Sequence, residues 1–388
     1  MAKTKTQSKT GTKSQSAQTP EELYTLAATS VDQLDYAQAL VHATSLLQAV
    51  DPDLACQKST TPVPLALPAL ILLGEISIEL GNDAEARGYF LLAIAGDPEG
   101  NLPDEAGGGA EKFLWLAQLS EDGGFDSVRW FEKGVAVMKR QIGELEKSKS
   151  AASEETLALL EEKRARVANA LCSVAEIYMT DLSWEEDAEQ RCESLITEAL
   201  IFAPDSPGVL QTLASIRLSQ VKVEEARSAL RRSMAVWQDL DPDDDLVPDF
   251  PTRVSLARLL MEAELEDEAM VVLERLALED DQSVEACYLG GWCLYLMAEK
   301  RDQAGHNGNN TGLDEVGSTR QASWKWLQNT IKLYDSQHYE DERIRQHTEE
   351  LLESMQKEPG FTPPEDGADE TEEWLDDEDS GDEDMADS

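Results

Sequence analysis

The sequence predicts an all-α protein, a right-handed superhelical solenoid of about seven helix pairs with a C-terminal capping helix and disordered tails. Three observations support this prediction. Apolar residues recur at steps of three and four over most of the chain, which is the spacing of an amphipathic helix. Turn-forming residues interrupt the pattern at short intervals, so the helices are expected in pairs. A single pair cannot bury its apolar face, whereas stacked pairs share one continuous core.

The clearest pair lies at residues 67–98, LPALILLGEISIELGNDAEARGYFLLAIAGDP. Two apolar runs with helical spacing are broken at residues 81–83, Gly-Asn-Asp, which predicts a tight turn between two short helices. Pro98 ends the second helix because it has no N–H to donate to the helix ladder. Small residues stand where the two helices must approach closely: Gly74 in the first, and Ala86 and Ala93 in the second.

This unit resembles the tetratricopeptide repeat, whose pattern is W-x2-L-G-x2-Y, then A-x3-F, then P. Leu70 and Ser77 replace the Trp and the Tyr of that pattern. The remaining positions match it: Leu73, Gly74, Ala86, Phe90, Ala93 and Pro98. The resemblance implies a solenoid whose inner surface is lined chiefly by the first helix of each pair.

Further units follow the same plan less closely and begin near residues 20, 110, 168, 207, 250 and 283. Helices at 128–148 and 154–180 are predicted to be longer than usual, which is consistent with a projecting hairpin. The last second helix is expected at 322–333, displaced by a Gly/Asn-rich loop at 301–319. The segment from Tyr339 predicts the polar-faced capping helix. The alternative is a set of unrelated helical bundles.

The charge of the chain is strongly negative. Asp and Glu number 78 against 33 Lys and Arg, a formal net charge of −45, so nucleic acid is excluded as a direct partner. Residues 1–19 carry lysines and no acid, whereas residues 358–388 carry acids and no Lys or Arg. The predicted organisation is a disordered N-terminal segment at 1–19, a solenoid at 20–357 and a disordered acidic tail at 358–388. An acidic tail on an acidic body calls for a basic partner from outside.

Targeting signals and cysteine usage predict a soluble cytoplasmic and nuclear protein. The five cysteines form no C-x-x-C motif, so buried free thiols in a reducing compartment are expected. The N-terminus has no apolar segment of the kind found in a secretory signal. The most apolar stretch, residues 63–74, is too short to span a bilayer core of ~30 Å.

Motifs for catalysis or cofactor binding are not found. The four histidines are scattered and none has the spacing of a zinc site. There is no phosphate-binding loop and no elbow around a nucleophile, and Gly107–Gly109 is interpreted as a linker. We therefore predict a protein that is not an enzyme, with no catalytic residue, no metal and no cofactor.

The resemblance to tetratricopeptide repeats also assigns residues to the inner surface. Taking the usual inward places of each first helix, the predicted groove is acidic with aromatic patches, and only Arg258 adds a positive charge. Its residues are Tyr24, Asp32, Glu75, Glu79, Trp115, Glu121, Asp122, Glu176, Glu262, Tyr288 and Tyr295. The alternative is that the carboxylates are an ordinary solvated face and that Trp115 and Tyr288 belong to the core.

The sign of this surface predicts its ligand. Repeats that bind the acidic C-termini of heat-shock chaperones use Lys, Arg and Asn at these places, so a cationic peptide is expected here instead. The acidic tail provides a second candidate partner-binding region, unless it serves solubility alone. Its residues are Glu372, Glu373, Asp376, Asp377, Glu378, Asp379, Asp382, Glu383 and Asp384.

As a whole the chain resembles the fungal tetratricopeptide chaperones dedicated to the fourth protein of the large ribosomal subunit. The resemblance covers the seven pairs and the tail, including the stretch EEWLDDED. It implies that the inner surface shields a basic loop of that ribosomal protein until it joins the pre-60S ribosome. It also implies a complex, expected to be 1:1, that travels from cytoplasm to nucleus without a membrane or nucleic-acid partner. A histone chaperone and a scaffold subunit are the alternatives.

Overall fold

The computed structural model describes residues 18–147, 153–305, 313–358 and 361–364. Within those residues the chain forms sixteen α-helices and two short 3-10 helices, and no strand occurs. The Lys-bearing segment up to residue 17 and the acidic tail from residue 365 lie outside the described residues. The expectation of an all-α fold is confirmed.

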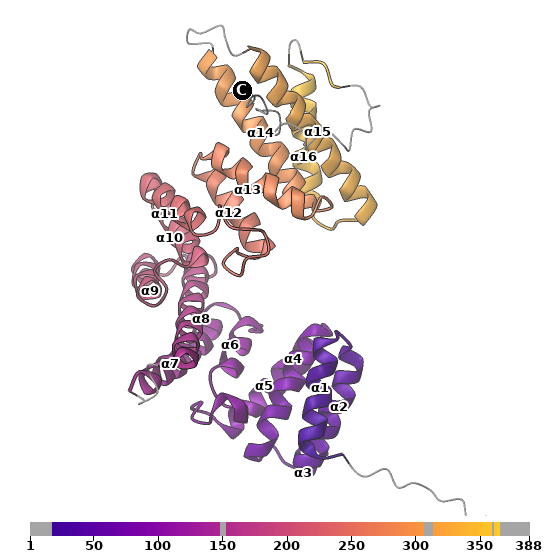
Figure 1. Ribbon diagram of the computed structural model, residues 1–388, viewed down its shortest axis with the longest axis vertical. Helices are drawn as coiled ribbons and strands as arrows, with labels where there is room; N and C mark the ends of the chain where they lie inside the picture. Colours follow the sequence, from indigo (N-terminus) through magenta and orange to yellow (C-terminus); the bar gives the residue numbers. More distant parts are fainter. Residues whose placement is uncertain (1–17, 148–152, 306–312, 359–360, 365–388) are drawn as a thin grey trace, which may run out of the picture. The chain divides into compact units, whose positions relative to one another are not determined.

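Helices α1 to α15 occur in the order of the seven expected pairs, and α16 follows as a single C-terminal helix (Figure 1). The short helix α3, Pro52–Ala55, is an addition that the sequence pattern does not predict. The paired helices and α16 are α1 Pro20–Asp32, α2 Tyr36–Val50, α4 Leu67–Glu79, α5 Asp83–Gly96, α6 Glu111–Gln118, α7 Gly124–Lys147, α8 Glu154–Met179, α9 Ala188–Phe202, α10 Pro207–Ser219, α11 Val223–Ala235, α12 Phe250–Glu262, α13 Glu266–Glu279, α14 Val284–Gly305, α15 Leu313–Gln337 and α16 Glu342–Gln356.

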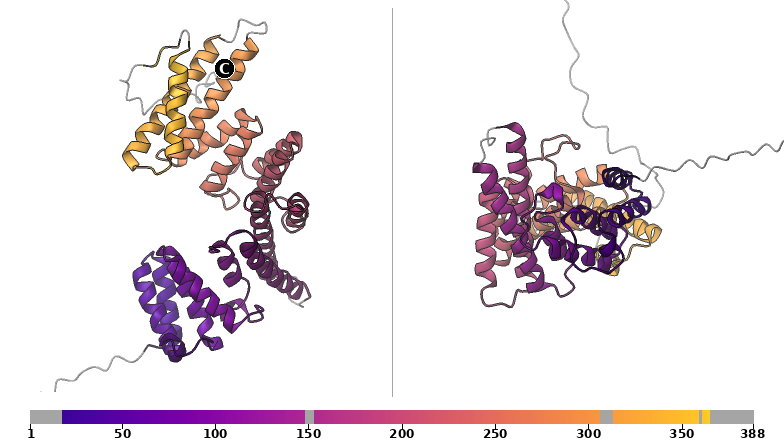
Figure 2. Two further views of the ribbon diagram at one scale, coloured as in Figure 1. Left: turned by 180° about the vertical axis from the view of Figure 1, so that it is seen from behind. Right: turned by 90° about the horizontal axis from the view of Figure 1, so that it is seen from below.

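Contacts between helices divide the chain into two compact units that meet in sequence at Gln220 and Val221. Helices α1–α10 belong to the first unit and α11–α16 to the second, so the fifth expected pair is shared between them. Within the first unit α2 packs on α4, and α5 packs on α6; within the second, α13 packs on α14. Figure 2 shows the same succession from two other directions. Within each unit, neighbouring pairs therefore pack on one another.

Glycines allow close helix contact at the positions expected from the repeat pattern. A Cβ on Gly74 of α4 would lie 2.5 Å from the Phe90 ring of α5, and the Phe90 side chain is fully buried. In the last pair, a Cβ on Gly290 of α14 would overlap the Trp326 ring of α15. The first helix of these pairs thus lacks a side chain where the second helix inserts a ring.

The turn between the two helices of a pair repeats with the same backbone conformation. Gly81 has φ +71°, and the equivalent residues Leu34 and Glu264 have φ +58°. In each turn the next N–H donates to a carbonyl five residues earlier, as from Asn82 to Ser77 at 2.8 Å. This is the Schellman arrangement, which satisfies the last carbonyls of a helix and reverses the chain.

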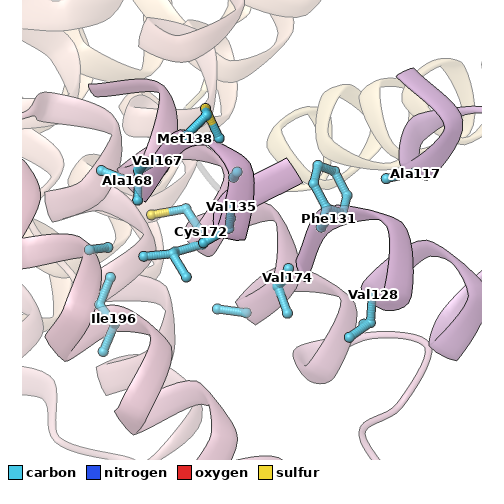
Figure 3. Packing of buried hydrophobic residues seen from close by; sticks show 14 of the residues in the cluster. Ala117, Val128, Phe131, Val135, Met138, Val167, Ala168, Cys172, Val174 and Ile196 are labelled. Atoms are coloured by element: carbon cyan, nitrogen blue, oxygen red, sulfur yellow. The ribbon is translucent and has the colours of Figure 1, made fainter. Parts of the chain in front are cut away.

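The largest hydrophobic core lies among helices α6 to α10 of the first unit (Figure 3). Aromatic and branched side chains of α7 meet the small-residue face of α8, and α9 closes the far side. Residues drawn in this core include Phe131, Val135 and Met138 of α7, Val167, Ala168, Cys172 and Val174 of α8, and Ile196 of α9. Both α7 and α8 are longer than the other helices of the first unit, as the sequence predicts.

Gly107–Gly109 lie in the segment that connects α5 and α6, residues 97–110, and this connection is packed against its neighbours. A Cβ on Gly107 would lie 2.5 Å from the backbone nitrogen of Pro68. The Asp104 carboxylate accepts hydrogen bonds from Lys163 at 2.7 Å and from Gln141 at 2.9 Å. Gly107 has no room for a Cβ beside the backbone of α4, and Gly108 and Gly109 have none beside Leu102 and Asp104 of their own segment.

The boundaries of the last pair also differ from expectation. Residues 301–305 continue α14 and residues 313–319 begin α15, so the predicted loop at 301–319 is largely helical. Arg320 binds Asp302 at 3.3 Å and Glu299 at 3.6 Å. These ion pairs join α14 to α15 outside the predicted second helix, 322–333. The contact between the two helices outweighs the weak helix propensity of the residues in the predicted loop.

Four of the five free thiols are buried, as expected, but Cys56 is exposed. Burial raises the pKa of Cys172 to about 11 and that of Cys293 to about 12. These two thiols therefore stay protonated and unreactive at neutral pH.

Candidate partner-binding surface

Glu75 on α4, the first helix of the second pair, lies close to Trp115 on α6, the first helix of the third pair. The Trp115 indole stacks on the Phe90 ring with centroids 6.2 Å apart and planes 15° apart. This stacking fixes a half-buried indole beside the Glu75 carboxylate. Trp115 Nε1 is buried and forms no hydrogen bond of ordinary geometry. It lies close enough to the Glu75 carboxylate to oppose the rise that burial causes in the pKa of that group. Trp115 thus packs in the core and is also partly exposed. From the sequence alone, a groove residue and a core residue were alternatives.

Glu75 is a desolvated carboxylate. Its side chain is half-buried, and burial raises its pKa above 4.5, while the nearby indole N–H of Trp115 partly offsets the rise. No basic group contributes to the shift. A carboxylate in this state loses hydration without gaining a counter-ion, so a cation from outside would restore favourable interactions.

Glu176 of α8 has the same character. Its side chain reaches solvent, yet desolvation raises its pKa, and a hydrogen bond from the Thr212 hydroxyl of α10, at 3.5 Å, only partly opposes this. Glu176 is thus exposed at the surface, with enough protein atoms around its carboxylate to disfavour the charged form. Again no basic side chain is among the causes of the shift.

Glu79 lies next to Tyr36, the first residue of α2. The pKa of Tyr36 is raised by desolvation and then by its contact with the Glu79 carboxylate. Tyr36 belongs to a second helix, so assigning inward places only on first helices does not find it. Its aromatic character was the one available sequence signal.

The other predicted residues of the first unit are exposed. Tyr24 and Asp32 lie on α1 with their side chains in solvent. Glu121 and Asp122 follow the end of α6 at Gln118 and therefore lie in the turn before α7, not on a first helix. The structure thus brings Glu75 and Trp115 together and places Glu121 and Asp122 at the pair's turn.

In the second unit the two predicted tyrosines contact the C-terminal helix α16. The Tyr288 hydroxyl hydrogen-bonds His347 Nδ1 at 2.7 Å, and the Tyr295 hydroxyl lies 3.2 Å from Ser354 Oγ. Glu262 is exposed in the last turn of α12. Arg258, the positive residue of the predicted set, pairs with Glu285 at 2.9 Å, so its charge is compensated locally.

The predicted tail residues between Glu372 and Asp384 lie outside the described residues. In the part of the chain that is described, no group of three His, Cys, Asp or Glu side chains has metal-binding geometry. None of the described helices has the length and apolar character needed to cross a membrane.

Curated proteins with related sequences identify the family. A protein of Emericella nidulans described as a probable assembly chaperone of rpl4 is 48% identical over 372 residues, 91% of this chain and 91% of that protein. A Schizosaccharomyces pombe protein with the same description is 34% identical over 288 residues, 74% of this chain and 80% of that protein. The chain belongs to the family of assembly chaperones of rpl4.

A solved structure of the family has the same fold. It contains residues 1–338 of the assembly chaperone of RpL4, Acl4, which is 48% identical to this chain. The TM-score is 0.68, with 74% of this chain and 99% of that chain covered. No protein-family model matches the sequence. The resemblance inferred from the repeat pattern and the acidic tail is therefore confirmed, as is the fold of tetratricopeptide-like helix pairs.

Proposed function

We propose that this protein is a dedicated chaperone that binds and shields a basic segment of newly made rpl4 until the ribosomal protein joins the pre-60S ribosome. Two separate carboxylates, Glu75 and Glu176, support this most directly. Desolvation raises the pKa of each, and no basic side chain is among the causes of either shift. Membership of the family of assembly chaperones of rpl4 supports rpl4 as the client.

Desolvated carboxylates attract a cationic segment for a physical reason. Removing water from an ionised carboxylate costs free energy unless an opposite charge or hydrogen bonds replace the water. A Lys or Arg of the client supplies both, so part of the cost is recovered only in the complex. The net charge of −45 adds long-range attraction and raises the association rate.

The aromatic residue next to Glu75 adds a second type of contact. The Trp115 indole is held in place by Phe90, and its remaining surface can accept an aliphatic stem or a guanidinium of the client. Tyr24, exposed on α1, extends the same chemistry to the first pair. We place Asp32, Glu79 and Glu262 in the binding surface as supporting charges.

The acidic tail, residues 358–388, acts in this proposal as a further capture region for the client. It contains no Lys or Arg, so its acidic side chains attract a basic protein, apart from Glu358, which is paired with Arg320 at 2.7 Å. The same excess of negative charge keeps the chain away from nucleic acid. We further propose a 1:1 complex that forms in the cytoplasm and enters the nucleus, with no catalytic step.

The decisive experiment measures the binding of purified rpl4 to the full chain by calorimetry at several salt concentrations. Binding by ionic contacts should weaken by orders of magnitude between low and moderate salt. The double variant Glu75→Lys with Glu176→Lys should lose most of the affinity. Binding that ignores both salt and this variant would refute the proposed surface.

A matched control has the same change in net charge. Glu144 on α7 and Glu161 on α8 are exposed and have no ion pair among the described residues, so Glu144→Lys with Glu161→Lys should leave most of the affinity intact. An equal loss in both double variants would mean that only net charge matters. Recovery of core histones in place of rpl4 from cells would favour the histone-chaperone alternative.

A further inference from the structure

Two aromatic side chains of the first unit are unusually open to solvent. The Trp184 side chain is 74% exposed and the Phe125 side chain 57%. Trp184 lies in the turn between α8 and α9, and Phe125 is the second residue of α7. A tryptophan on a surface is typical of interaction sites, because its large ring gains much from burial against a partner.

Contacts between the two segments bring these aromatic residues to one region. The Gly124 N–H donates to Asp181 Oδ2 at 3.3 Å. A Cβ on Gly124 would lie 3.2 Å from the Leu182 side chain, and Leu182 is buried in the core of the first unit. The start of α7 is therefore fixed against the turn that carries Trp184.

Carboxylates lie within a few residues of each ring in the sequence. The residues are Glu121, Asp122, Asp181, Glu185 and Glu186, and none forms an ion pair with another described residue. The nearest arginines in sequence are already paired, Arg129 with Asp126 at 2.5 Å and Arg191 with Asp187 at 3.1 Å. We call Phe125, Trp184 and these five carboxylates the turn patch.

We propose that the turn patch is a docking surface for an arginine-bearing segment of the basic client. The guanidinium of arginine stacks on an indole face and donates to carboxylates at the same time. Lysine has a compact, strongly hydrated ammonium without the planar fork of a guanidinium, so it combines the two contacts less favourably. The turn patch has both parts, an open indole and uncompensated carboxylates, and therefore selects arginine over lysine.

The turn patch is distinct from the surface around Glu75 and Trp115. Its residues lie in the turns of the third and fourth pairs, whereas Glu75 and Trp115 lie on first helices. A basic client can thus contact the first unit at two places, one governed by desolvated carboxylates and the other by stacking. The inference rests on the proposed function because it assumes a basic client.

The test uses the full chain and two probes, a deca-arginine peptide and a deca-lysine peptide of equal charge, with affinities measured by calorimetry. The wild-type chain should bind deca-arginine more tightly than deca-lysine. Trp184→Ala should weaken deca-arginine binding by about two- to fivefold, the range of a cation–π contact at a surface, and reduce the preference for arginine. Phe125→Ala should act in the same direction with a smaller effect.

Ile201→Ala is the matched control, because Ile201 is 75% exposed on α9 and does not belong to the turn patch. It should leave both affinities unchanged. Equal effects of Trp184→Ala and Ile201→Ala, or equal binding of the two peptides by the wild-type chain, would overturn the turn patch. Both substitutions are at open positions, and circular dichroism verifies that the helices remain.

Binding of rpl4 itself separates this inference from the proposed function. If the wild-type chain binds rpl4 and Trp184→Ala binds it equally well, the turn patch is wrong and the proposed function stands. If the wild-type chain fails to bind rpl4, the proposed function fails. Hydrogen exchange should show that rpl4 protects residues 121–126 and 180–187, and absence of protection there would also contradict the turn patch.

Discussion

The ammonium of Lys112 donates to the carboxylate of Asp97 at 2.7 Å, and both side chains are buried. The same carboxylate accepts the N–H of Asn101 at 2.8 Å. Lys112 begins the third pair, and Asp97 ends the second. A charge pair sealed in the first unit thus fixes the junction of two pairs.

Lys112→Met should destabilise the chain strongly. Removing the ammonium leaves the Asp97 carboxylate buried without its counter-ion, a change that costs about 3 to 5 kcal/mol. The double variant Lys112→Met with Asp97→Asn should recover part of this loss, since no uncompensated charge remains. Denaturant unfolding measures both, and a double variant as unstable as the single one would contradict this account.

Acid should weaken the same junction. Burial by itself raises the pKa of Asp97, but hydrogen bonds from Lys112 and from the N–H groups of Asn101 and Leu102 outweigh it and hold the pKa below 3.8. A carboxyl group with a lowered folded-state pKa contributes stability above its unfolded pKa and loses it as pH falls through the folded value. The free energy of unfolding should therefore fall below about pH 4, and less steeply in the double variant.

Glu75→Gln should stabilise the fold while weakening client binding. Because desolvation raises the pKa of Glu75, the ionised form is disfavoured in the folded chain, and this destabilisation disappears when the group is neutral. We expect a gain of up to about 1 kcal/mol in the free energy of unfolding at pH 7. The affinity of the variant for rpl4 should be lower. In the wild-type chain the affinity should decrease on acidification, beginning at a higher pH than the ordinary pKa of a glutamate would give.

The distinctive result is that Glu75→Gln raises the free energy of unfolding and lowers the affinity for rpl4. Gln at Glu144, an exposed position away from Glu75, serves as the control and should change neither quantity much. A destabilised Glu75→Gln variant would mean that the carboxylate has a partner in the folded chain.

Gly74→Ala should destabilise the second pair. Its Cβ would lie 2.5 Å from the Phe90 ring, so the ring or the helix must move, at a cost of about 1 to 3 kcal/mol. Gly88 of α5 is the matched control, because a Cβ there meets nothing within 4 Å. Gly88→Ala should stabilise by up to about 1 kcal/mol through helix propensity. Similar thermal shifts for both variants would exclude the close-contact explanation.

Val221→Asn should raise stability. Val221 has φ +61°, which is unfavourable for a β-branched residue, and its side chain is 82% exposed. Asparagine tolerates this conformation, so relief of strain should add about 1 kcal/mol. Leu80→Asn, at φ −86°, should bring no gain, and thermal unfolding compares the two. An unchanged midpoint for Val221→Asn would argue against strain at this turn.

Truncation after residue 364 should slow association with rpl4 more than it accelerates dissociation. The removed residues carry acids and no Lys or Arg, and long-range attraction acts mainly on the encounter rate. Stopped-flow mixing at low and moderate salt resolves the two rates. A faster dissociation with unchanged association would assign the tail a holding role instead.

Local pattern determined most of the fold. The helical spacing in 67–98, the turn at Gly81 and the small residue Gly74 specified a pair that forms as expected, because helix periodicity and turn chemistry depend on near neighbours in sequence. The resemblance to tetratricopeptide repeats assigned Glu75, Trp115 and Glu176 to the inner surface, and their role in binding a partner stays a prediction. The domain division at residues 19 and 357 stays a prediction.

Tertiary structure decided what depends on distance between segments. The sequence could not indicate that Lys112 would neutralise Asp97, that Gly107 would pack on α4, or that Tyr288 would contact His347. Nor could it separate Glu75, which is desolvated, from Glu121, which lies in an open turn. Hydration and charge pairing depend on every atom nearby, whatever its position in sequence, so the same residue type acquires different chemistry at each site. The amino-acid sequence alone thus determined the helix pairs and the sign of their charge, and the packing decided which carboxylates are left without a counter-ion.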